Sequence, residues 1–261
     1  MPVVVHCPFH EDSTPSLAIY EDHAFCFGGC GKISLESIRD LVERLSIRPS
    51  SPREGSTDER WRHLLPLWRW NLLVGPMQWR QRFFHERGIT TRMIERYWLG
   101  HTGRWFVIPV WFDGRITGIR YRRDDLFSEE DDTKYRNPRG QGALLFRPNP
   151  DGWPTVITEG ELDALLLSEA GCDAVTSTGG AGSLSKMQLE LIHWPLFVAT
   201  DQDDAGEHAW EALAARFRQR IYRWRWAEGK DISEALSRLP REAWGSWIRE
   251  RIRECEARGC Q

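Results

Sequence analysis

The sequence has no apolar run that approaches the ~18 residues needed to cross a membrane, so a membrane-spanning protein is not expected. Its first residues, Met1 to His6, have neither a basic segment nor a cleavage-like site, which argues against a signal peptide. No internal repeat is evident, and no Gly-x-x-x-x-Gly-Lys-Ser/Thr loop occurs, so no fused P-loop motor is expected. We therefore expect a cytoplasmic protein without membrane partners.

Cysteine is scarce, with six in 261 residues, and in the cytoplasm these thiols would stay reduced. Reduced cysteines favour metal binding over disulfide bonds. Three of them, Cys7, Cys26 and Cys30, fall within the first thirty residues, whereas the other three are scattered. The N-terminal segment is therefore the place to look for a metal site.

Net positive charge is also lacking, since the formal charge is −3, which at first argues against a nucleic-acid-binding protein. The average conceals a strong polarity, because the segment from Trp61 to Arg123 contains twelve arginines and only three acids. Acids gather later, at Ser128 to Asp132 and between Glu159 and Glu211. A basic region followed by an acidic one suits a protein that holds phosphate backbones and binds cations. The alternative is an ordinary solvated, arginine-rich surface.

Two close pairs of metal-binding residues stand in the N-terminal segment, and they are Cys7 with His10 and Cys26 with Cys30. Zinc takes four such ligands in a tetrahedron, and paired ligands on tight turns close that shell in small domains. A piece of about 46 residues has too little core to fold stably without such help. The spacing therefore predicts one structural zinc ion. The alternative is a set of buried reduced cysteines with an unrelated histidine.

Hydrophobic patterning predicts a multi-domain protein of α+β and α/β type. Alternating strands and helices after Pro154 predict a parallel α/β sheet, and Asp113-Gly114 between two strand-like runs is a hairpin signal. The predicted parts are a zinc-ribbon-like module at 1–46, a flexible linker at 47–60, a mixed α+β basic subdomain at 61–150, a parallel-sheet subdomain at 151–240 and a helical tail at 241–261. The expected strands are one around His6 and those at 18–20, 24–27, 105–112, 115–122, 156–158, 174–176, 196–200 and 221–226. The expected helices are 34–45, 77–87, 91–97, 162–170, one beginning at 186, 208–218 and 244–257.

Carboxylates follow two of the expected parallel strands. Glu159 comes directly after the strand at 156–158, and Asp201 and Asp203 follow the strand at 196–200. The carboxyl ends of parallel strands meet at one edge of the sheet, where α/β proteins place their ligands. Carboxylates gathered there repel one another unless cations neutralise them, and Mg²⁺ is the expected ion. The alternative is that these acids are simply exposed at strand ends.

The N-terminal motif resembles a known module. Cys7-Pro8-Phe9-His10, Thr14-Pro15-Ser16 and the glycine-flanked pair from Cys26 to Cys30 are similar to the CHC2 zinc module of bacterial and phage (DnaG-like) DNA primases. Three residues separate Cys26 from Cys30, where the family more commonly has two. The resemblance implies contact with single-stranded template. Four aromatic side chains could stack on bases or form the module's small core, and they are Phe9, Tyr20, Phe25 and Phe27. For Phe25 and Phe27 we favour the interpretation as core residues.

The acidic motif resembles the TOPRIM signature of primases, topoisomerases and some nucleases. Glu-Gly-x-x-Asp is carried by Glu159 and Asp163, and Asp-x-Asp-x-Ala-Gly by the segment from Asp201 to Gly206. The resemblance implies catalytic roles for Glu159, Asp201 and Asp203. It implies Mg²⁺ or Mn²⁺ binding by Glu159, Asp163, Asp201, Asp203 and Asp231. Ser233 departs from the pattern, since bacterial primases usually have a second aspartate there, which puts one metal-binding carboxylate in doubt.

The basic segment is similar to the substrate-binding part of primase cores, although its motifs are weaker. They are Glu86 to Ile89, Tyr97 to Gly100, Ile108 to Trp111, Gly118 to Arg122 and Lys134 to Pro138. The resemblance implies that four side chains face the nucleoside triphosphate or the template–primer backbone, and these are Arg87, Arg122, Lys134 and Asn137.

Together the motifs predict a DNA primase, a DNA-directed RNA polymerase that makes short RNA primers on single-stranded DNA from NTPs. A 3′-hydroxyl would attack the α-phosphate of the next nucleotide and release pyrophosphate, with divalent cations lowering the hydroxyl pKa. A replicative helicase acting in trans is a further expected partner, and the length suits a primase of a phage or other mobile element. The rival functions are a TOPRIM nuclease and a single-strand-binding replication factor whose acidic site has decayed.

Overall fold

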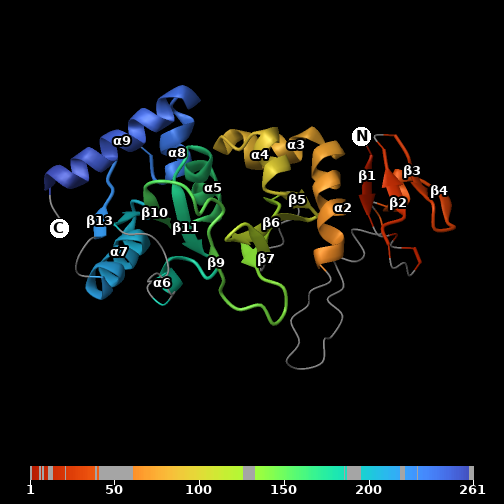
Figure 1. Ribbon diagram of the computed structural model, residues 1–261, viewed down its shortest axis with the longest axis horizontal. Coiled ribbons are helices and arrows are strands. Elements are labelled where there is room, and N and C mark those ends of the chain that lie inside the picture. Colours follow the sequence, from red (N-terminus) through yellow and green to blue (C-terminus); the bar gives the residue numbers. More distant parts are fainter. Residues whose placement is uncertain are drawn as a thin grey trace. The chain divides into compact units, whose positions relative to one another are not determined.

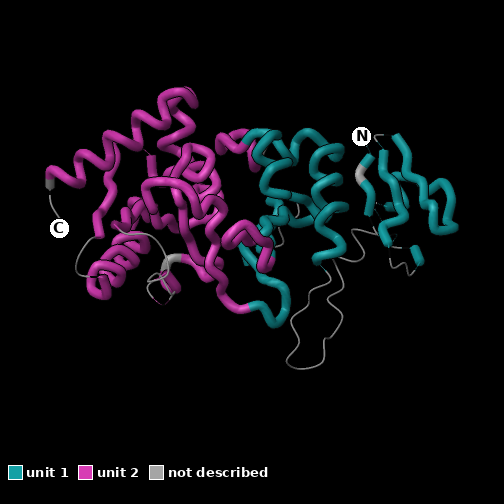
Figure 2. The backbone as a smooth tube through the Cα atoms, viewed as in Figure 1, with its two compact units in different colours: residues 1–82, 90–109, 119–141 teal, residues 83–89, 110–118, 142–261 magenta. Residues whose placement is uncertain are grey.

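The computed structural model describes residues 2–5, 7, 9–10, 14–20, 22–38, 40, 61–125, 133–184, 186, 195–217, 221–227 and 229–258. The expected linker at 47–60, half of the expected helix at 34–45 and nearly all of the one beginning at 186 lie outside these residues. Two compact units are formed, one from residues 1–82, 90–109 and 119–141 and the other from 83–89, 110–118 and 142–261 (Figure 2). Since these units interleave along the chain, the linear domain division stays a prediction.

The first unit begins with a small antiparallel sheet. Its strands run in the order β1 (Val3–Val5), β2 (Leu17–Ile19), β3 (Ala24–Cys26) and β4 (Gly31–Ile33). Leu17, Ile19 and Ala24 are fully buried and make a core of only a few side chains. The strands predicted at 18–20 and 24–27 are confirmed. For the strand predicted around His6, β1 lies directly before that residue, and His6 itself is outside the described residues. So small a core leaves the sheet dependent on a further source of stability.

Helix α2 (Trp61–Val74) was not predicted from the sequence. It contains Pro66, which removes a backbone donor from the helix interior, at a typical cost of about 3 kcal/mol. Burial of Trp61, Leu65, Trp68 and Leu72, spaced three or four residues apart, offsets that cost. Arg80 satisfies carbonyls at the helix's carboxyl end, since its Nη1 donates to the oxygens of Leu72 and Leu73 at 2.5 Å.

The helix expected over 77–87 is divided into three short pieces. They are α3 (Met77–Trp79), the π-helical η1 (Arg80–Phe84) and the 3-10 turn η2 (His85–Arg87), which ends at Gly88 with φ of 79°. Helix α4 (Thr91–Arg96) follows, and the Thr90 side chain caps it by accepting a hydrogen bond from the Met93 amide. The helix predicted at 91–97 is therefore confirmed, and residues 77–87 are helical as predicted, although their later turns are π- and 3-10-helical.

A second antiparallel sheet has the order β5 (Gly100–His101), β6 (Trp105–Phe112), β7 (Arg115–Arg123) and β8 (Tyr135–Arg136). Asp113 and Gly114 join β6 to β7 with φ of 47° and 74°. Positive φ at both central residues is the geometry that two-residue hairpin turns require. The predicted hairpin is confirmed, including its turn.

The second unit is built on a five-stranded, mainly parallel sheet (Figure 1). Its order is β13 (Ile221–Arg223), β12 (Leu196–Ala199), β10 (Thr155–Thr158), β11 (Asp173–Ser177) and β9 (Leu145–Phe146), of which β9 is antiparallel. The helices are α5 (Glu161–Glu169), α6 (Ala181–Leu184), α7 (Asp204–Arg216), α8 (Ile232–Ser237) and α9 (Arg241–Arg258). The predicted parallel α/β sheet is confirmed.

Helices α5 and α7 lie on opposite sides of this sheet, as right-handed crossovers in opposite directions require (Figure 1). Residues 161–168 of α5 are all buried. The core on the other side comprises Ile157, Val175, Leu184, Leu196, Val198, Leu213, Phe217 and Ile221. The carboxyl ends of β10 and β12 therefore lie side by side above a well-packed base.

A buried ion pair fixes the edge strand of this sheet. Arg147, directly after β9, donates from Nε and Nη2 to the two carboxylate oxygens of Asp173, both at 2.8 Å. The Thr155 hydroxyl donates to the same carboxylate at 3.1 Å.

None of the helices in the described part of the chain combines the length and apolarity of a membrane span.

Candidate metal centres and nucleic-acid surface

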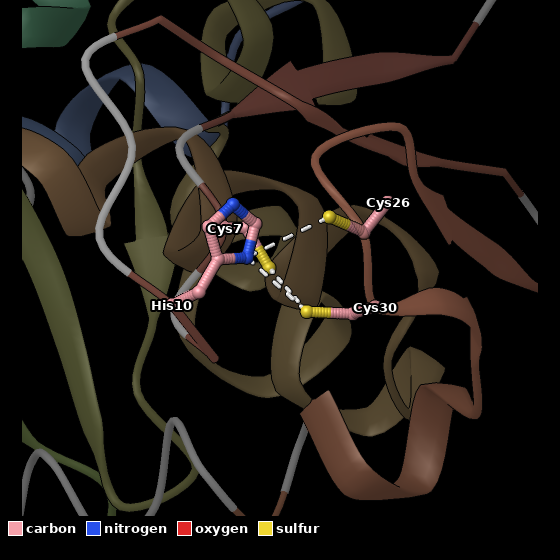
Figure 3. A group of neighbouring side chains, drawn as sticks. All are labelled: Cys7, His10, Cys26 and Cys30. Atoms are coloured by element: carbon pink, nitrogen blue, oxygen red, sulfur yellow. Dashed lines mark hydrogen bonds between the residues drawn. The ribbon is translucent and has the colours of Figure 1, made fainter.

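The small sheet gathers the four predicted N-terminal ligands. Cys7 follows β1, Cys26 ends β3 and Cys30 precedes β4, and His10 turns its ring toward the sulfurs (Figure 3). The four ligand atoms all lie within 4.8 Å of one another. Cys30 Sγ is 3.8 Å from Cys7 Sγ and 3.1 Å from His10 Nδ1. These four side chains could hold one metal ion.

Two local features support this arrangement. A side chain at Gly28 would place a Cβ 2.5 Å from His10 Nε2, so the glycine is needed for the ring to fit. Burial raises the pKa of the Cys26 thiol, but hydrogen bonds from the Cys30 amide and the Ser16 hydroxyl outweigh it and lower the pKa to about 6. Cys26 is therefore ready to act as a thiolate ligand. Burial raises the pKa of Cys7 to about 12, which a bound cation would reverse.

Aromatic side chains of the small sheet face solvent. Phe27 is 71% exposed, Phe9 42% and Phe25 39%, and the rings of Phe25 and Phe27 lie 5.0 Å apart. Tyr20 stacks on His23 instead. The interpretation of Phe25 and Phe27 as core residues is therefore wrong, because buried aliphatic side chains fill that core and both rings are left outside it.

The acidic residues converge at the carboxyl edge of the parallel sheet. Glu159 follows β10, and Asp201 and Asp203 follow β12. Burial, and then the charge of Asp203, raises the pKa of Glu159. Burial, and then the charge of Glu159, raises the pKa of Asp201 to about 7. Glu159 Oε2 is buried and lacks a hydrogen-bond partner among the described residues. The negative charges of Glu159 and Asp201 are therefore not fully balanced by positive charge at this edge.

The loop after β12 is shaped by one close approach. A Cβ at Gly206 would lie 1.9 Å from the carbonyl oxygen of Asp201, so only glycine fits. Asp203 caps α7 by accepting from the Gly206 amide at 3.0 Å, and this bond, followed by the contact with Lys230, lowers the pKa of Asp203. The Thr200 hydroxyl donates to the Gly206 carbonyl at 2.8 Å. These bonds fix the direction in which both aspartates project.

Asp163 and Asp231 lie beside the same edge, and each is engaged by α8. Asp163 is buried, and its Oδ1 accepts from the Ser233 amide at 2.9 Å and from the Ser233 hydroxyl at 2.6 Å. Burial, and then the charge of Asp231, raises its pKa to about 7. Asp231 caps α8 by accepting from the Glu234 amide at 2.7 Å. Metal binding by Asp163 and Asp231 stays a prediction.

The two predicted metal groups differ in how tightly they close. Among the described residues, only the Cys/His group brings three or more possible ligand side chains close enough together to bind one ion by themselves. The carboxylates lie further apart, although they are near enough to shift one another's pKa. Such spacing suits an ion that keeps several water or phosphate ligands.

Two cationic residues at this edge were missed by sequence reasoning. Lys230 Nζ lies 2.9 Å from Asp203 Oδ2 and 3.9 Å from Asp201 Oδ2. Arg223, at the end of β13, donates to the Thr200 hydroxyl and to Glu207 Oε1, the latter at 2.8 Å. Lys230 directly precedes a predicted ligand, Asp231, and that position was the available signal. Nothing in the sequence around Arg223 distinguishes it from the chain's many other arginines.

Three of the four predicted substrate-binding residues come together in the first unit. Arg122 and Lys134 lie over the ring of Tyr135, at 5.2 and 5.9 Å from its centroid. Arg120 lies over the same ring at 4.9 Å and donates to Asn137 Oδ1 at 3.1 Å. Arg122 is 95% buried, whereas Lys134 is exposed.

The fourth predicted residue, Arg87, belongs to the second unit. Its Nη1 donates to the Phe83 carbonyl at 3.1 Å, and its guanidinium lies over the Phe83 ring. Both contacts are local to η1 and η2. A substrate-binding role for Arg87, as for the other three, stays a prediction.

Comparison with known proteins gives a consistent result. Residues 156–236 match the family model of Toprim-like domains. The primase fragment of the bacteriophage T7 primase–helicase protein has a TM-score of 0.53 and 19% identity, covering 97% of this chain and 100% of that one. The RNA polymerase domain of Mycobacterium tuberculosis primase DnaG has a TM-score of 0.53 and 15% identity, covering 83% and 84%.

A DnaG primase catalytic domain bound to single-stranded DNA has a TM-score of 0.52 and 15% identity, and 82% of each chain is covered. No curated protein sequence matches this chain. At these identities the likeness establishes the fold. The chain has the fold of DnaG-type primase cores, and the resemblance predicted from its motifs is confirmed at that level.

Proposed function

We propose that this chain is a DNA primase that makes short RNA primers on single-stranded DNA by divalent-metal-dependent nucleotidyl transfer. One observation carries the proposal. A Cys/His group with metal-binding geometry and a carboxylate group at the edge of a Toprim-like sheet occur in one chain with a primase-core fold. Neither group alone would separate priming from other nucleic-acid chemistry.

Zinc is the ion that fits the N-terminal group. A tetrahedral zinc site with bonds of about 2.3 Å to sulfur has sulfur–sulfur edges of roughly 3.8 Å. Cys7 Sγ and Cys30 Sγ are 3.8 Å apart, and the fourth ligand is an imidazole nitrogen. All four protein ligands are supplied, which is typical of a structural site. The exposed Phe9, Phe25 and Phe27 would offer faces on which template bases stack.

Mg²⁺ or Mn²⁺ fits the carboxylate group. When bound, such an ion would supply positive charge that offsets the charge of a triphosphate and lowers the pKa of an attacking hydroxyl. Glu159 and Asp201 would hold it, since their raised pKa values and the unpartnered Glu159 Oε2 mark where positive charge is missing. Asp203 lies beside them and fixes the loop through its cap on α7. Asp163 and Asp231 would support the group from α5 and α8.

The basic residues would bind phosphates. Lys134 is exposed beside Tyr135 and would meet a triphosphate or template backbone directly, and Arg122, although buried, would add its positive charge beside the same ring. Asn137 is held by Arg120 and would be positioned for hydrogen bonds to the same ligand. A phosphate-binding role for Arg87, which lies in the second unit, is part of the same proposal. A cytoplasmic location and a helicase partner in trans belong to the same proposal.

The test is a priming assay with the zinc-loaded chain, Mg²⁺ or Mn²⁺, labelled NTPs and single-stranded DNA of varied sequence. The wild-type chain should make short oligoribonucleotides, and Asp201→Asn should lower the rate by about a hundredfold or more. Asp151→Asn is the matched control, because Asp151 is exposed just before β10, at the opposite edge of the sheet. Absence of product on all templates would contradict the proposal.

A second candidate is a single-strand-binding replication factor without synthesis. Ser233 stands where bacterial primases usually carry a carboxylate, and Lys230 partly neutralises the remaining acids. That function predicts DNA binding equal in the wild type and Asp201→Asn, with no oligoribonucleotide from either. A nuclease would instead shorten end-labelled DNA in the same reactions.

A further inference from the structure

Lys230 introduces a permanent positive charge among the carboxylates. Its ammonium contacts Asp203 Oδ2 at 2.9 Å and lies 3.9 Å from Asp201 Oδ2, although the side chain is 56% exposed. The same ammonium therefore faces two acids that project from the loop after β12. An isolated surface ion pair would contact one carboxylate and be weak.

The backbone holds this lysine in place. The Gln202 amide donates to the Lys230 carbonyl at 2.8 Å, and Gln202 Nε2 donates to the Gly229 carbonyl at 2.8 Å. Trp226 Nε1 also donates to the Gly229 carbonyl, at 3.0 Å, and the Lys230 amide donates to Glu234 Oε2 at 2.9 Å. Gln202 stands between the two aspartates in the chain, so Lys230 is fixed to the loop that carries them.

The carboxylate count at this edge is reduced as well. The Ser233 hydroxyl donates to buried Asp163, so the position adds a neutral donor and directs the Asp163 carboxylate toward α8. Glu159 and Asp201 are left as the two acids at strand ends that α8 does not engage and that Lys230 does not contact at hydrogen-bond distance. Fewer carboxylates and an added cation lower the positive charge that the site needs from solution.

We propose that Lys230 takes the charge-compensating place of a second divalent cation, so that the acidic group binds a single divalent ion through Glu159 and Asp201. Asp203 stays paired with the Lys230 ammonium and does not bind the divalent ion. The inference rests on the proposed function in that it assigns the metal requirement of the same site. Lysine suits this place because its ammonium is a compact point charge, whereas guanidinium is a planar fork.

The chain uses lysine sparingly, which makes its presence here informative. Only four of its 35 Lys and Arg residues are lysines, and they are Lys32, Lys134, Lys186 and Lys230. One of these four, Lys230, lies at the acidic edge, with its ammonium 2.9 Å from the Asp203 carboxylate and 3.9 Å from the Asp201 carboxylate.

The experiment counts Mn²⁺ bound to the zinc-loaded full chain by electron paramagnetic resonance of the free ion. The wild type should bind one Mn²⁺ per chain, and Glu159→Gln should abolish that binding. Lys230→Met should bind the first ion about fivefold more tightly, because removal of an exposed positive charge relieves repulsion that solvent only partly screens. It should also gain a second Mn²⁺ at Asp203. Lys230→Arg should keep a stoichiometry of one.

Arg249→Met is the matched control, since it removes an exposed cation from α9, and it should bind Mn²⁺ like the wild type. Two ions of comparable affinity in the wild type, or equal binding by Lys230→Met and wild type, would overturn the inference. The readout is independent of synthesis. If the chain makes primers but binds two ions, only this inference is contradicted. If the chain binds one ion in a Lys230-dependent manner but makes no primer, only the proposed function is contradicted.

Discussion

The Cys/His group and the carboxylate group are both candidate metal sites, but they are constructed in opposite ways. The first is closed, because four ligand atoms on the turns of a small sheet already lie within 4.8 Å of one another. The second is open, because its acids project from the ends of separate strands and partly face solvent. A closed site leaves an ion no position for substrate, whereas an open one leaves room for water and phosphate. The difference separates a stabilising role from a chemical one.

Metal removal should affect the two groups very differently, and this is the largest effect we expect. Stripping zinc with a chelator, or replacing Cys26 by Ala, should unfold the small sheet, because its core is only a few side chains. Limited proteolysis should then cut within residues 1–40 and leave a protected fragment from the second unit. Cys172→Ala is the control, since Cys172 is a buried cysteine outside the group and zinc content should be unchanged. An intact small sheet without zinc would contradict the assignment of a structural role.

A single methyl group should break the open site. Gly206→Ala would place a Cβ 1.9 Å from the Asp201 carbonyl oxygen, so the loop must shift and both aspartates lose their directions. We expect a loss of stability of about 2–4 kcal/mol and loss of Mn²⁺ binding, with zinc content unaffected. Thermal unfolding and metal titration measure both. Gly182→Ala is matched, because among the described residues no atom outside its own helix lies within 4 Å of its Cβ position, and it should behave like the wild type.

A smaller effect concerns pH in the absence of divalent ions. The pKa of Asp163 is raised from 3.8 to about 7 in the folded chain, chiefly by burial, so the folded state holds a proton that the unfolded state releases. The contribution of this group to stability is therefore full below about pH 4 and falls as the pH rises through 7, by on the order of 2–3 kcal/mol between pH 5 and pH 8. Asp201, also shifted to about 7, adds to the same trend.

Unfolding of the metal-free chain at pH 5 and pH 8 checks the sign. Asp163→Asn should make the dependence shallower, since the amide keeps an acceptor for the Ser233 hydroxyl without a charge. Asp151→Asn, which removes an exposed carboxylate, should leave the slope as it is. A rise in stability between pH 5 and pH 8 would show that Asp163 is ionised at little cost in the folded chain.

Local patterns predicted the elements whose signals are short-range. Strand β6 and the turn at Asp113-Gly114 follow from a continuous run of apolar residues and a turn dipeptide. Helix α2 escaped prediction because Pro66 interrupts the pattern, and only tertiary burial of its apolar face reveals why the helix persists. Propensity is a weak guide where packing decides.

The candidate sites divide along the same line. The zinc ligands and the acids at strand ends could be predicted because residue type and spacing carry the chemistry. The contacts that tune the acidic edge could not, since Ser233 meets Asp163 across 70 positions of sequence, and helix α7 and strand β13 separate Lys230 from Asp203 in the chain. The exposure of Phe27 could not be predicted either, because the sequence of a short turn does not indicate whether an aromatic side chain in it packs inward or faces solvent.

The edge strand β9 has a consequence for how the protein behaves at high concentration. It pairs with β11 through only two residues, and beyond it the Arg147 amide donates to the Trp111 carbonyl at 2.6 Å while Phe112 bridges to Arg147. Little free backbone is thus offered to a strand from another molecule, and the charged Arg147 is turned inward to Asp173. We expect this edge of the sheet to resist pairing with a strand of another molecule at high concentration, as long as this arginine is kept.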